Sequence, residues 1–337
     1  MTLTLAAWLH TIDPYAIKLW EGGPIRWYGL SYLLGFLLAL FLIKRITRVG
    51  VSTLPTARAG DLVLNLAIGI VVGGRLGSVL FYNPHLLREF SDSAPYWGVL
   101  DLQGGGMSSH GGMIGGILAT YLFARRHQQS WPFTLDLMAF SAPLGLFFGR
   151  LANFINGELV GRPTAPDFPL AVQFPQTLYD NPDTYRAMVQ AYGQELPPHW
   201  LDHLQAGNVK LQQAAAAVLE TRHPSQLYAA VLEGLIVFAV LLWLWRKPRR
   251  AGSIAGAFCI TYAVMRLFNE FFRQPDAHLG LQAWGLSRGQ WLSIPLLLLG
   301  ISVIILAVRF KTPRMGAWRR GPWTPPLPAE PATPPGP

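Results

Sequence analysis

Charge and cysteine are both scarce in this chain of 337 residues. Only 13% of the residues are charged, and Cys259 is the single cysteine. One cysteine excludes an intramolecular disulfide, and no group of cysteines and histidines has the spacing of a zinc site, so we expect no metal. The hydrophobic fraction, in contrast, is 51%. That balance is unusual for a soluble domain of this length and indicates a protein that lies in a bilayer.

The pattern of a cleavable leader is also missing near the start of the chain. The first segment has no basic start followed by a compact apolar core and a small-residue cleavage site, so we expect the first span to be an uncleaved anchor. Apolar runs long enough to cross ~30 Å of hydrocarbon occur seven times. They lie at about residues 28–43, 62–82, 110–124, 133–155, 227–245, 253–272 and 291–310. The sequence predicts an all-α polytopic membrane protein with seven transmembrane helices.

Basic residues mark one side of the expected membrane. Clusters follow the first, third, fifth and seventh spans: Lys44, Arg45 and Arg48; Arg125 and Arg126; Arg246, Lys247, Arg249 and Arg250; Arg309, Lys311, Arg314, Arg319 and Arg320. The positive-inside rule then places the N-terminus outside and the C-terminus inside. The net charge of +9 is therefore a topology signal. Nucleic-acid binding is the weaker interpretation, because the cations are divided among four short loops beside helices.

Two segments differ from the apolar spans. Residues 156–226 form an unusually long connection, and we expect a small external head subdomain with a helix near 199–220. Residues 311–337 are rich in proline and have little to bury, so we expect a disordered cytoplasmic tail. The expected organisation is four transmembrane helices in 1–155, the head in 156–226, three helices in 227–310, and the tail in 311–337.

Three arginines, Arg75, Arg150 and Arg266, fall inside predicted spans. An arginine in hydrocarbon costs ~3 kcal/mol on insertion scales, so each needs a partner, a water path or a function. Each precedes the outer end of its span by roughly five to seven residues, which places the three guanidiniums at one depth in the outer leaflet. The oppositely directed spans contribute Tyr28, His110 and Glu233 to the same layer.

Helical spacing collects polar groups on common faces. One face of the fourth span carries Arg150, Asn153 and Gly157, and one face of the sixth carries Tyr262, Arg266, Asn269, Glu270 and Arg273. For any one arginine, snorkelling or a structural ion pair with Glu233 or Glu270 is an equally good interpretation. Three cations exceed those two acids, which favours an anion, most simply a phosphate. The position of His110 is a weaker indication, since a histidine at a helix start is often a cap, although its depth suits acid–base chemistry.

Five motifs occur in order along the spans. They are "GGRLGSVLFYN" (73–83), "GGMSSHGGMIGG" (105–116), "GRLANFINGELVGR" (149–162), "RHPSQLY" (222–228) and "EFFRQPD" (270–276). In these motifs the chain resembles the bacterial phosphatidylglycerol–prolipoprotein diacylglyceryl transferases, from Tyr28 to about Phe310. The chain departs from many members at Ser109, Ala152, Val160 and Ala229, which leaves the fine shape of the pocket open.

The resemblance implies a reaction. The diacylglyceryl group of phosphatidylglycerol moves onto the lipobox cysteine thiol of a prolipoprotein, a thioether forms and glycerol phosphate leaves, with no metal or nucleotide cofactor. It also implies the bacterial cytoplasmic (inner) membrane, with the active site facing the outer leaflet. His110 matches the family's essential histidine and is the expected base for the thiol, with a lipid oxygen as the open alternative. Arg150 and Arg266 match its essential arginines and are expected to stabilise the departing phosphate.

The resemblance carries further residues over to the phosphatidylglycerol pocket. Arg75 is expected to hold a headgroup. The residues expected to shape the pocket or to orient the arginines are Tyr28, Asn153, Asn156, Glu158, Gly161, Tyr262 and Glu270. The number of lipids bound, the product exit and the oligomeric state are not specified by the sequence.

An anion transporter or channel is the rival class of function, because buried arginines also line such pathways. A transport pathway needs polar residues at the midplane and in the inner half, where this chain has few. A non-catalytic lipid-binding scaffold is the third possibility.

Overall fold

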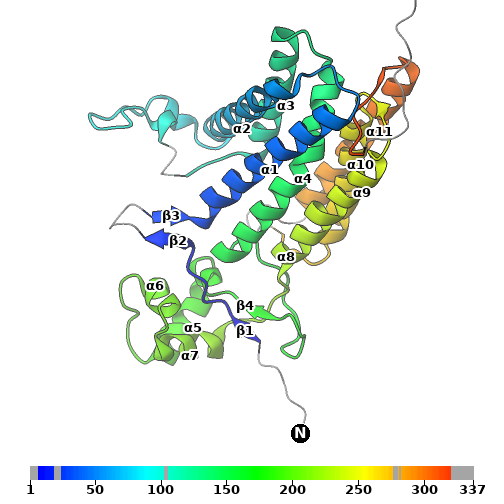
Figure 1. The fold of residues 1–337 in the computed structure, drawn as a ribbon. Coiled ribbons are helices and arrows are strands. Elements are labelled where there is room, and N and C mark those ends of the chain that lie inside the picture. The colour runs from blue at the N-terminus through cyan, green and yellow to red at the C-terminus, as the bar shows by residue number, and fades with distance from the viewer. Residues whose placement is uncertain (1–6, 19–23, 102–104, 276–279, 281, 320–337) are drawn as a thin grey trace, which may run out of the picture. The chain divides into compact units, whose positions relative to one another are not determined.

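The structure is a computed structural model built mainly of helices (Figure 1). It describes residues 7–18, 24–101, 105–275, 280 and 282–319. Two compact units divide the chain. Unit 1 comprises Met1–Ala39, Ala139–Leu241 and Ala255–Ile304, and unit 2 comprises Leu40–Met138, Leu242–Ile254 and Ile305–Pro337.

Five helical segments among the described residues are long and apolar enough to cross a membrane. They are α1 (Trp27–Val49), η1 with α2 (Thr56–Arg58 and Ala59–Phe81), α4 (Trp131–Asn156), α8 to α9 (Ser225–Leu244) and α11 (Arg288–Arg309). Helix α10 (Ser253–Asn269) is apolar but shorter, and α3 (Ser109–Arg126) is rich in glycine and ends in two arginines. All seven expected ranges are thus helical, and the protein is a polytopic membrane protein. Seven crossings remain a prediction.

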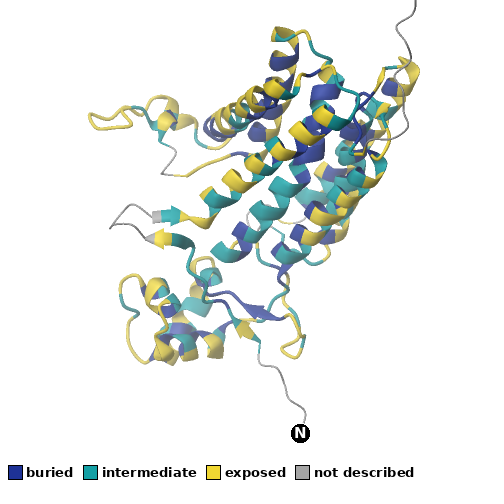
Figure 2. Ribbon diagram, viewed as in Figure 1, coloured by how far each residue is buried: buried dark blue, intermediate teal, exposed yellow. Residues whose placement is uncertain are grey.

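The long helices expose apolar side chains that a soluble protein would bury. On α1, Leu33, Leu37 and Phe41 follow one another at four-residue spacing, and each is more than half exposed (Figure 2). Such a stripe is unfavourable in water but suits a surface covered by lipid tails.

A π-helical turn interrupts the helix of residues 225–244 in unit 1. It comprises η5 (Ala230–Ile236), between α8 (Ser225–Ala229) and α9 (Val237–Leu244). This turn carries Glu233, followed by Gly234. A Cβ atom at position 234 would lie only 2.7 Å from the Cβ atom of Phe147 on α4, so the glycine allows the two helices to approach closely.

Outside its long helices, unit 1 contains two small ribbons and a helical cluster. Strand β1 (Trp8–Leu9) pairs in parallel with β4 (Val172–Gln173), and β2 (Tyr15–Lys18) pairs antiparallel with β3 (Pro24–Arg26). Helices α5 (Pro182–Tyr192), α6 (Trp200–Gln205) and α7 (Val209–Val218) surround an apolar core of their own, preceded by η4 (Pro175–Tyr179).

The expected single helix near 199–220 was wrong. The chain breaks between α6 and α7 at Gly207, whose φ is +98°. Asn208 then starts a new helix, because its side-chain oxygen accepts a hydrogen bond from the backbone N–H of Leu211 at 3.1 Å. A glycine that ends one helix and an asparagine that starts the next are both known signals, but the apolar pattern continues across Gly207 and Asn208 and does not indicate the break.

Glycine determines how the helices of unit 2 pack. Helices α2 and α3 face each other through Gly73 and Gly77 on one side and Gly111 and Gly115 on the other. A Cβ atom at Gly73 would lie 2.8 Å from the Cα atom of Gly115, and one at Gly77 would lie 2.8 Å from that of Gly111. The two backbones therefore touch, as small residues permit within membranes.

The last described residues of unit 2 are ordered. Strand β6 (Arg314–Met315) pairs antiparallel with β5 (Arg249–Arg250), and the indole N–H of the fully buried Trp245 donates to the carbonyl of Met315 at 3.0 Å. The tail predicted to be disordered from residue 311 therefore begins with a paired strand. Its remainder, residues 320–337, lies outside the described residues.

Candidate active site

Two arginines converge on one buried carboxylate in unit 1. Glu233, on the π-helical turn, is 0% exposed. Its Oε2 accepts from Nε and Nη2 of Arg150 on α4, at 3.1 and 2.7 Å. Its Oε1 accepts from Nη1 of Arg266 on α10, at 3.1 Å. The carboxylate thus holds guanidiniums from two helices, which offsets the desolvation of all three charges.

Neutral groups complete the coordination of Glu233. The side-chain amide of Asn269 donates to Oε1 at 3.2 Å, and the hydroxyl of Tyr262 donates to Oε2 at 3.4 Å. Both residues come from α10, in the helical register predicted from the sequence. These donors occupy both oxygens of the buried carboxylate.

Arg266 has a second acidic partner. Its Nη2 forms an ion pair with Glu270, one helical turn later, and Oε2 of Glu270 accepts from the hydroxyl of Ser287 at 2.6 Å. Gly289 lies against this pair, and a side chain there would collide with the Glu270 carboxylate. Arg266 is therefore fixed from two sides.

A second polar cluster joins the start of α1 to the end of α4. The hydroxyl of Tyr28 lies in hydrogen-bonding contact with Oδ1 of Asn153 and with the carboxylate of Glu158. Asn153 is buried, one turn of α4 after Arg150, whereas Glu158 is exposed. Three of the predicted pocket residues therefore meet, at the end of the helix that carries Arg150.

The chain beyond α4 pairs with the chain beyond α10. Backbone hydrogen bonds run from Arg162 N to Phe272 O at 2.8 Å and from Gln274 N to Val160 O at 3.2 Å. Between them, Gly161 donates from its N–H to the carbonyl of His223 at 3.1 Å, and a Cβ atom at 161 would collide with that carbonyl. Gly161 is thus needed for the close approach of three chain segments.

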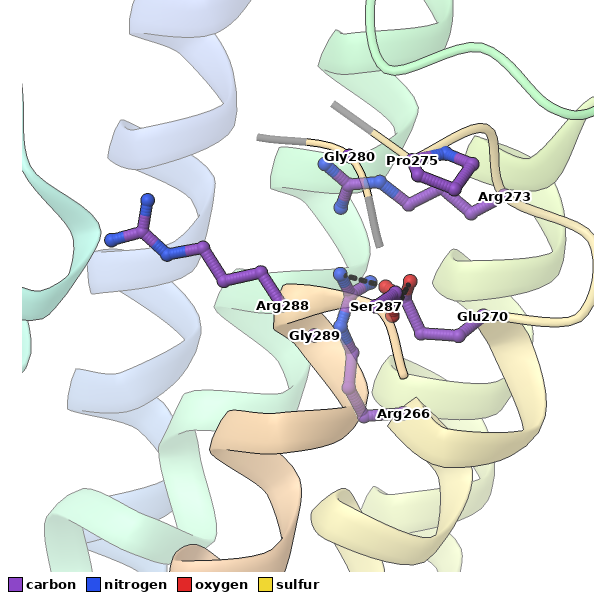
Figure 3. Close-up of a pocket in the computed structure, with 8 residues that line it drawn as sticks. All are labelled: Arg266, Glu270, Arg273, Pro275, Gly280, Ser287, Arg288 and Gly289. Carbon is purple, nitrogen blue, oxygen red and sulfur yellow. Dashed lines mark hydrogen bonds and ion pairs between the residues drawn. The ribbon is translucent and has the colours of Figure 1, made fainter. Parts of the chain in front are cut away.

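Two small pockets open beside these charges. The first is lined by Arg266, Glu270, Arg273, Pro275, Gly280, Ser287, Arg288 and Gly289 (Figure 3). The second is lined by Arg150, Leu159, Ser225, Gln226, Ala229, Arg266, Asn269 and Arg273. In Figure 3 Arg288 points away from the ion pair of Arg266 with Glu270.

Arginines concentrate around the two pockets. Among the described residues, four arginines line them, Arg150, Arg266, Arg273 and Arg288, and Glu233 and Glu270 form ion pairs with the first two. Guanidinium groups beside a cavity suit an anionic ligand, and a phosphate matches the bidentate geometry of arginine.

The predicted site residues divide between the units. Unit 1 contains Tyr28, Arg150, Asn153, Asn156, Glu158, Gly161, Tyr262, Arg266 and Glu270, and unit 2 contains His110 and Arg75. His110 is the second residue of α3 and is half-buried, next to a helix start that Ser108 caps through the backbone N–H of Gly111 at 3.2 Å. Oδ1 of Asn156 is buried and has no hydrogen-bond partner among the described residues.

Arg75 makes contacts other than those expected. It is buried, and its Nε and Nη2 donate to the carbonyls of Val99 and Gly98 at 2.7 and 2.6 Å. Its Nη1 donates to Gly105 and Gly106 at 2.6 and 3.2 Å. Backbone carbonyls thus take up most of the donors of this arginine. These contacts hold the α2–α3 connection, and the expected role of Arg75 at a lipid headgroup stays a prediction.

Sequence reasoning placed Glu233 in the arginine layer and named it as a possible ion-pair partner, but did not place it among the site residues. Its central position, and the contributions of Ser287 and Gln226, depend on contacts between helices that no single segment reveals. One signal was available for Glu233, because an acid inside the apolar run "VLEGLIVFAVLLWLW" is costly without a cationic partner.

Comparison with known proteins identifies the group to which this arrangement belongs. Residues 14–306 match the family described as prolipoprotein diacylglyceryl transferase. The chain belongs to this family. The resemblance seen in the five motifs is thereby confirmed.

Relatives from several bacteria share most of the chain. A protein from Bdellovibrio bacteriovorus is 42% identical over 93% of this chain and 97% of its own length. One from Idiomarina loihiensis is 40% identical over 88% of this chain and 93% of its own. One from Rhodospirillum rubrum is 41% identical over 89% and 94%. All three are named phosphatidylglycerol–prolipoprotein diacylglyceryl transferase, which favours a transferase over the transporter and scaffold alternatives.

Proposed function

We propose that this chain transfers the diacylglyceryl group of phosphatidylglycerol to the lipobox cysteine thiol of prolipoproteins. A thioether forms, and glycerol phosphate is released. The observation that carries the proposal is the convergence of Arg150 and Arg266 on Glu233 beside two arginine-lined pockets, in a chain of this family.

The arginines act on the leaving group. As the sulfur attacks the glyceryl carbon, the bond from that carbon to the phosphate oxygen breaks and the electron pair stays with the phosphate. Negative charge therefore grows on the phosphate, and guanidiniums already fixed in place stabilise the transition state more than the ground state. Glu233 and Glu270 supply that fixation through their ion pairs with the two arginines.

The thiol must lose its proton during the attack. A free cysteine has a pKa of ~8.5, so it is a poor nucleophile until a base accepts the proton. We assign that role to His110, with a lipid oxygen as the alternative acceptor. Tyr28, Asn153 and Glu158 then hold the end of α4 in place beside the lipid.

Asn156, Gly161, Tyr262 and Glu270 complete the proposed pocket. Asn156 presents a buried oxygen that is open to a lipid hydroxyl, and Gly161 leaves room for the approach of three chain segments. Tyr262 and Glu270 orient the arginines through Glu233 and Arg266.

The proposal includes a topology. Seven helices cross the bacterial inner membrane with the N-terminus outside, the basic clusters inside and the active site in the outer leaflet. Residues 156–226 form the external head, which helps to admit the prolipoprotein, and the proline-rich tail lies in the cytoplasm. No nucleic acid takes part.

Incubation of the purified protein with phosphatidylglycerol vesicles and a lipobox peptide tests the activity. Mass spectrometry is expected to find the peptide cysteine heavier by one diacylglyceryl group. An unmodified peptide, together with anion flux in liposomes, would identify a transporter instead.

Arg150→Lys and Arg266→Lys test the role of the arginines. Lysine keeps the charge but loses the planar, bidentate donor set, so we expect turnover in the same assay to fall on the order of 100-fold. Arg186→Lys is the matched control, because Arg186 forms an exposed ion pair with Asp183 on α5. Full turnover of both site variants would rule out bidentate phosphate recognition.

His110→Gln tests the base. Glutamine keeps a similar size and polarity but cannot accept the thiol proton, so we expect a loss of about 100-fold or more. The loss should shrink as the pH of the assay rises and the thiol ionises by itself. If the variant keeps the wild-type rate and pH profile, the acceptor of the thiol proton is the lipid oxygen and not His110.

A further inference from the structure

The connection between α2 and α3 exposes an unusual amount of apolar surface. It starts directly after α2, one of the candidate membrane spans, and contains η2 (Pro84–Leu87) and η3 (Gly98–Leu100). The exposed large side chains are Phe81, Tyr82, Leu87, Phe90, Tyr96 and Leu100. Phe90 is 71% and Tyr96 64% exposed. A patch of this kind on a protein surface marks a contact with another apolar phase or partner.

Its composition suits the boundary of a bilayer. Aromatic side chains concentrate at the level of the lipid headgroups, where an apolar ring and a polar edge are both accommodated. The formal charges in residues 82–101 are Arg88, Glu89, Asp92 and Asp101, one positive against three negative. Attraction to anionic headgroups therefore cannot hold this segment at a membrane, and insertion of its apolar side chains must do so.

The segment is a closed, ordered turn. Phe90 and Trp97 form a backbone bridge, and their rings stack at 6.1 Å with an angle of 7° between the planes. The indole N–H of Trp97 donates to the carbonyl of Leu87 at 3.2 Å, and the N–H of Gly98 donates to the carbonyl of Glu89 at 2.8 Å. The exposed rings are thus presented at defined positions, at little further cost in conformational entropy.

Arg75 fastens this turn to α2. Through Gly98 and Val99 it holds the end of the turn, and through Gly105 and Gly106 it holds the chain that leads into α3. The arginine is buried inside the α2 segment, where its charge is costly without partners. Four carbonyl acceptors arranged around one planar cation meet that cost and set the direction of the turn.

We propose that residues 81–101 form an interfacial loop, which inserts Phe90, Tyr96 and Leu100 between the headgroups and acyl chains at the end of α2. Arg75 is its positioning residue. The occupant is lipid because the loop continues the exposed apolar face of α2, where Leu76 and Leu80 also lack protein cover. This inference depends on the membrane position of α2 and not on the transferase reaction.

Site-directed spin labelling tests the position of the loop. Cys259 is the only cysteine, so Cys259→Ala provides a background for Phe90→Cys or Tyr96→Cys. In lipid nanodiscs, nitroxides at both positions are expected to collide more with oxygen, which partitions into lipid, than with an aqueous nickel chelate. Asp183→Cys, on the exposed face of α5, is the control and is expected to show the reverse.

Two results would overturn the proposal. One is a nickel accessibility at positions 90 and 96 equal to that at the control. The other is protection of both nitroxides from oxygen and from the nickel chelate that appears only after a lipobox peptide is added. That result would show that the loop binds the peptide and not lipid. Both measurements need no turnover, so they separate this proposal from the transferase assignment.

Arg75→Lys, combined with the label at position 90, tests the tether. The lysine ammonium has only three N–H donors and cannot bind four carbonyls. The nitroxide at position 90 is therefore expected to become more mobile and to lose its higher collision rate with oxygen. An unchanged spectrum would remove Arg75 from the proposal. The depth measurement on the loop itself does not require this variant to fold.

Discussion

At the scale of single residues, Glu233 is the group on which the site depends. It is buried among donors from two helices, and its removal would leave Arg150 and Arg266 facing each other without a carboxylate between them. Breaking a buried ion pair costs about 3–5 kcal/mol, because an uncompensated charge stays buried.

Glu233→Gln should therefore lose activity although Glu233 contacts no substrate in the proposed reaction. Glutamine keeps one acceptor oxygen but loses the charge that fixes both guanidiniums, so we expect turnover to fall roughly 100-fold. Peptide modification under saturating lipid measures it. Glu220→Gln is the control, since Glu220 pairs with Arg222 at 2.8 Å on the surface, where such pairs contribute about 0–1 kcal/mol. Equal rates for the two variants would contradict the central role of Glu233.

Arg75 and Arg150 show how far single residues can be interpreted from sequence. Both are arginines in apolar spans, so both were predicted to need a partner, and both have one. An ion pair with Glu233 or Glu270 was one interpretation for each arginine, but which arginine would have such a partner was not predictable. Arg75 meets backbone carbonyls of a loop more than 20 residues away, whereas Arg150 meets a carboxylate on another helix. Insertion cost identifies an important arginine, but only packing reveals its role.

At the scale of elements, the π-helical turn η5 positions the carboxylate. Sequence periodicity describes residues 225–244 as one continuous apolar helix, because a single wide turn leaves the hydrophobic pattern almost unchanged. The structure places this turn where Glu233 must reach two arginines. Such turns occur often at functional sites.

Gly234→Ala tests the packing of this turn. The added methyl group would meet Phe147, which precedes Arg150 by one turn of α4, at 2.7 Å. We expect a destabilisation of about 1–3 kcal/mol from overpacking, and a loss of activity of roughly 10–100-fold as Glu233 moves from Arg150. Thermal unfolding and the peptide assay measure the two effects.

Gly145→Ala is the matched control for this prediction. It lies on the same helix as Phe147, and no heavy atom lies within 4 Å of its added Cβ. The exchange should leave activity unchanged and stabilise α4 by up to ~1 kcal/mol through helix propensity. If Gly145→Ala and Gly234→Ala lose similar amounts of stability and activity, the contact of η5 with Phe147 has no particular role in positioning Glu233.

At the scale of the whole molecule, hydropathy and charge were the informative signals. Apolar length predicted every long helix to within a few residues, because a bilayer demands runs of that length. Contacts between distant segments were not predictable. The parallel pairing of Trp8 with Val172 is one example, since nothing in two short strands specifies a partner so far along the chain.

That pairing buries His10, with a consequence for stability. The imidazole is packed against the rings of Trp8, Phe154 and Phe174, and burial lowers its pKa from 6.5 to about 4. Between these two values the unfolded chain binds a proton that the folded chain does not. The free energy of unfolding therefore falls as the pH drops through this range, by roughly 3 kcal/mol for this group, and the full contribution is present above pH 6.5.

Comparison with His10→Phe isolates the effect. Phenylalanine fills a similar volume among the rings but does not titrate, so its unfolding temperature should fall less than that of the parent chain as the pH drops from 6.5 to about 4. If the unfolding temperatures of the two proteins fall equally with pH, protonation of His10 costs no extra free energy in the folded state.

The backbone pairing of residues 160–162 with 272–274 has a mechanical consequence. It ties together the ends of α4 and α10, the two helices that carry Arg150 and Arg266. Lateral pressure or a change of bilayer thickness tilts single helices readily, at a cost of fractions of a kcal/mol per Å. Because the ends of α4 and α10 are joined, such a force moves the two helices together. The distance between the guanidiniums of Arg150 and Arg266 therefore changes little when the tension of the membrane changes.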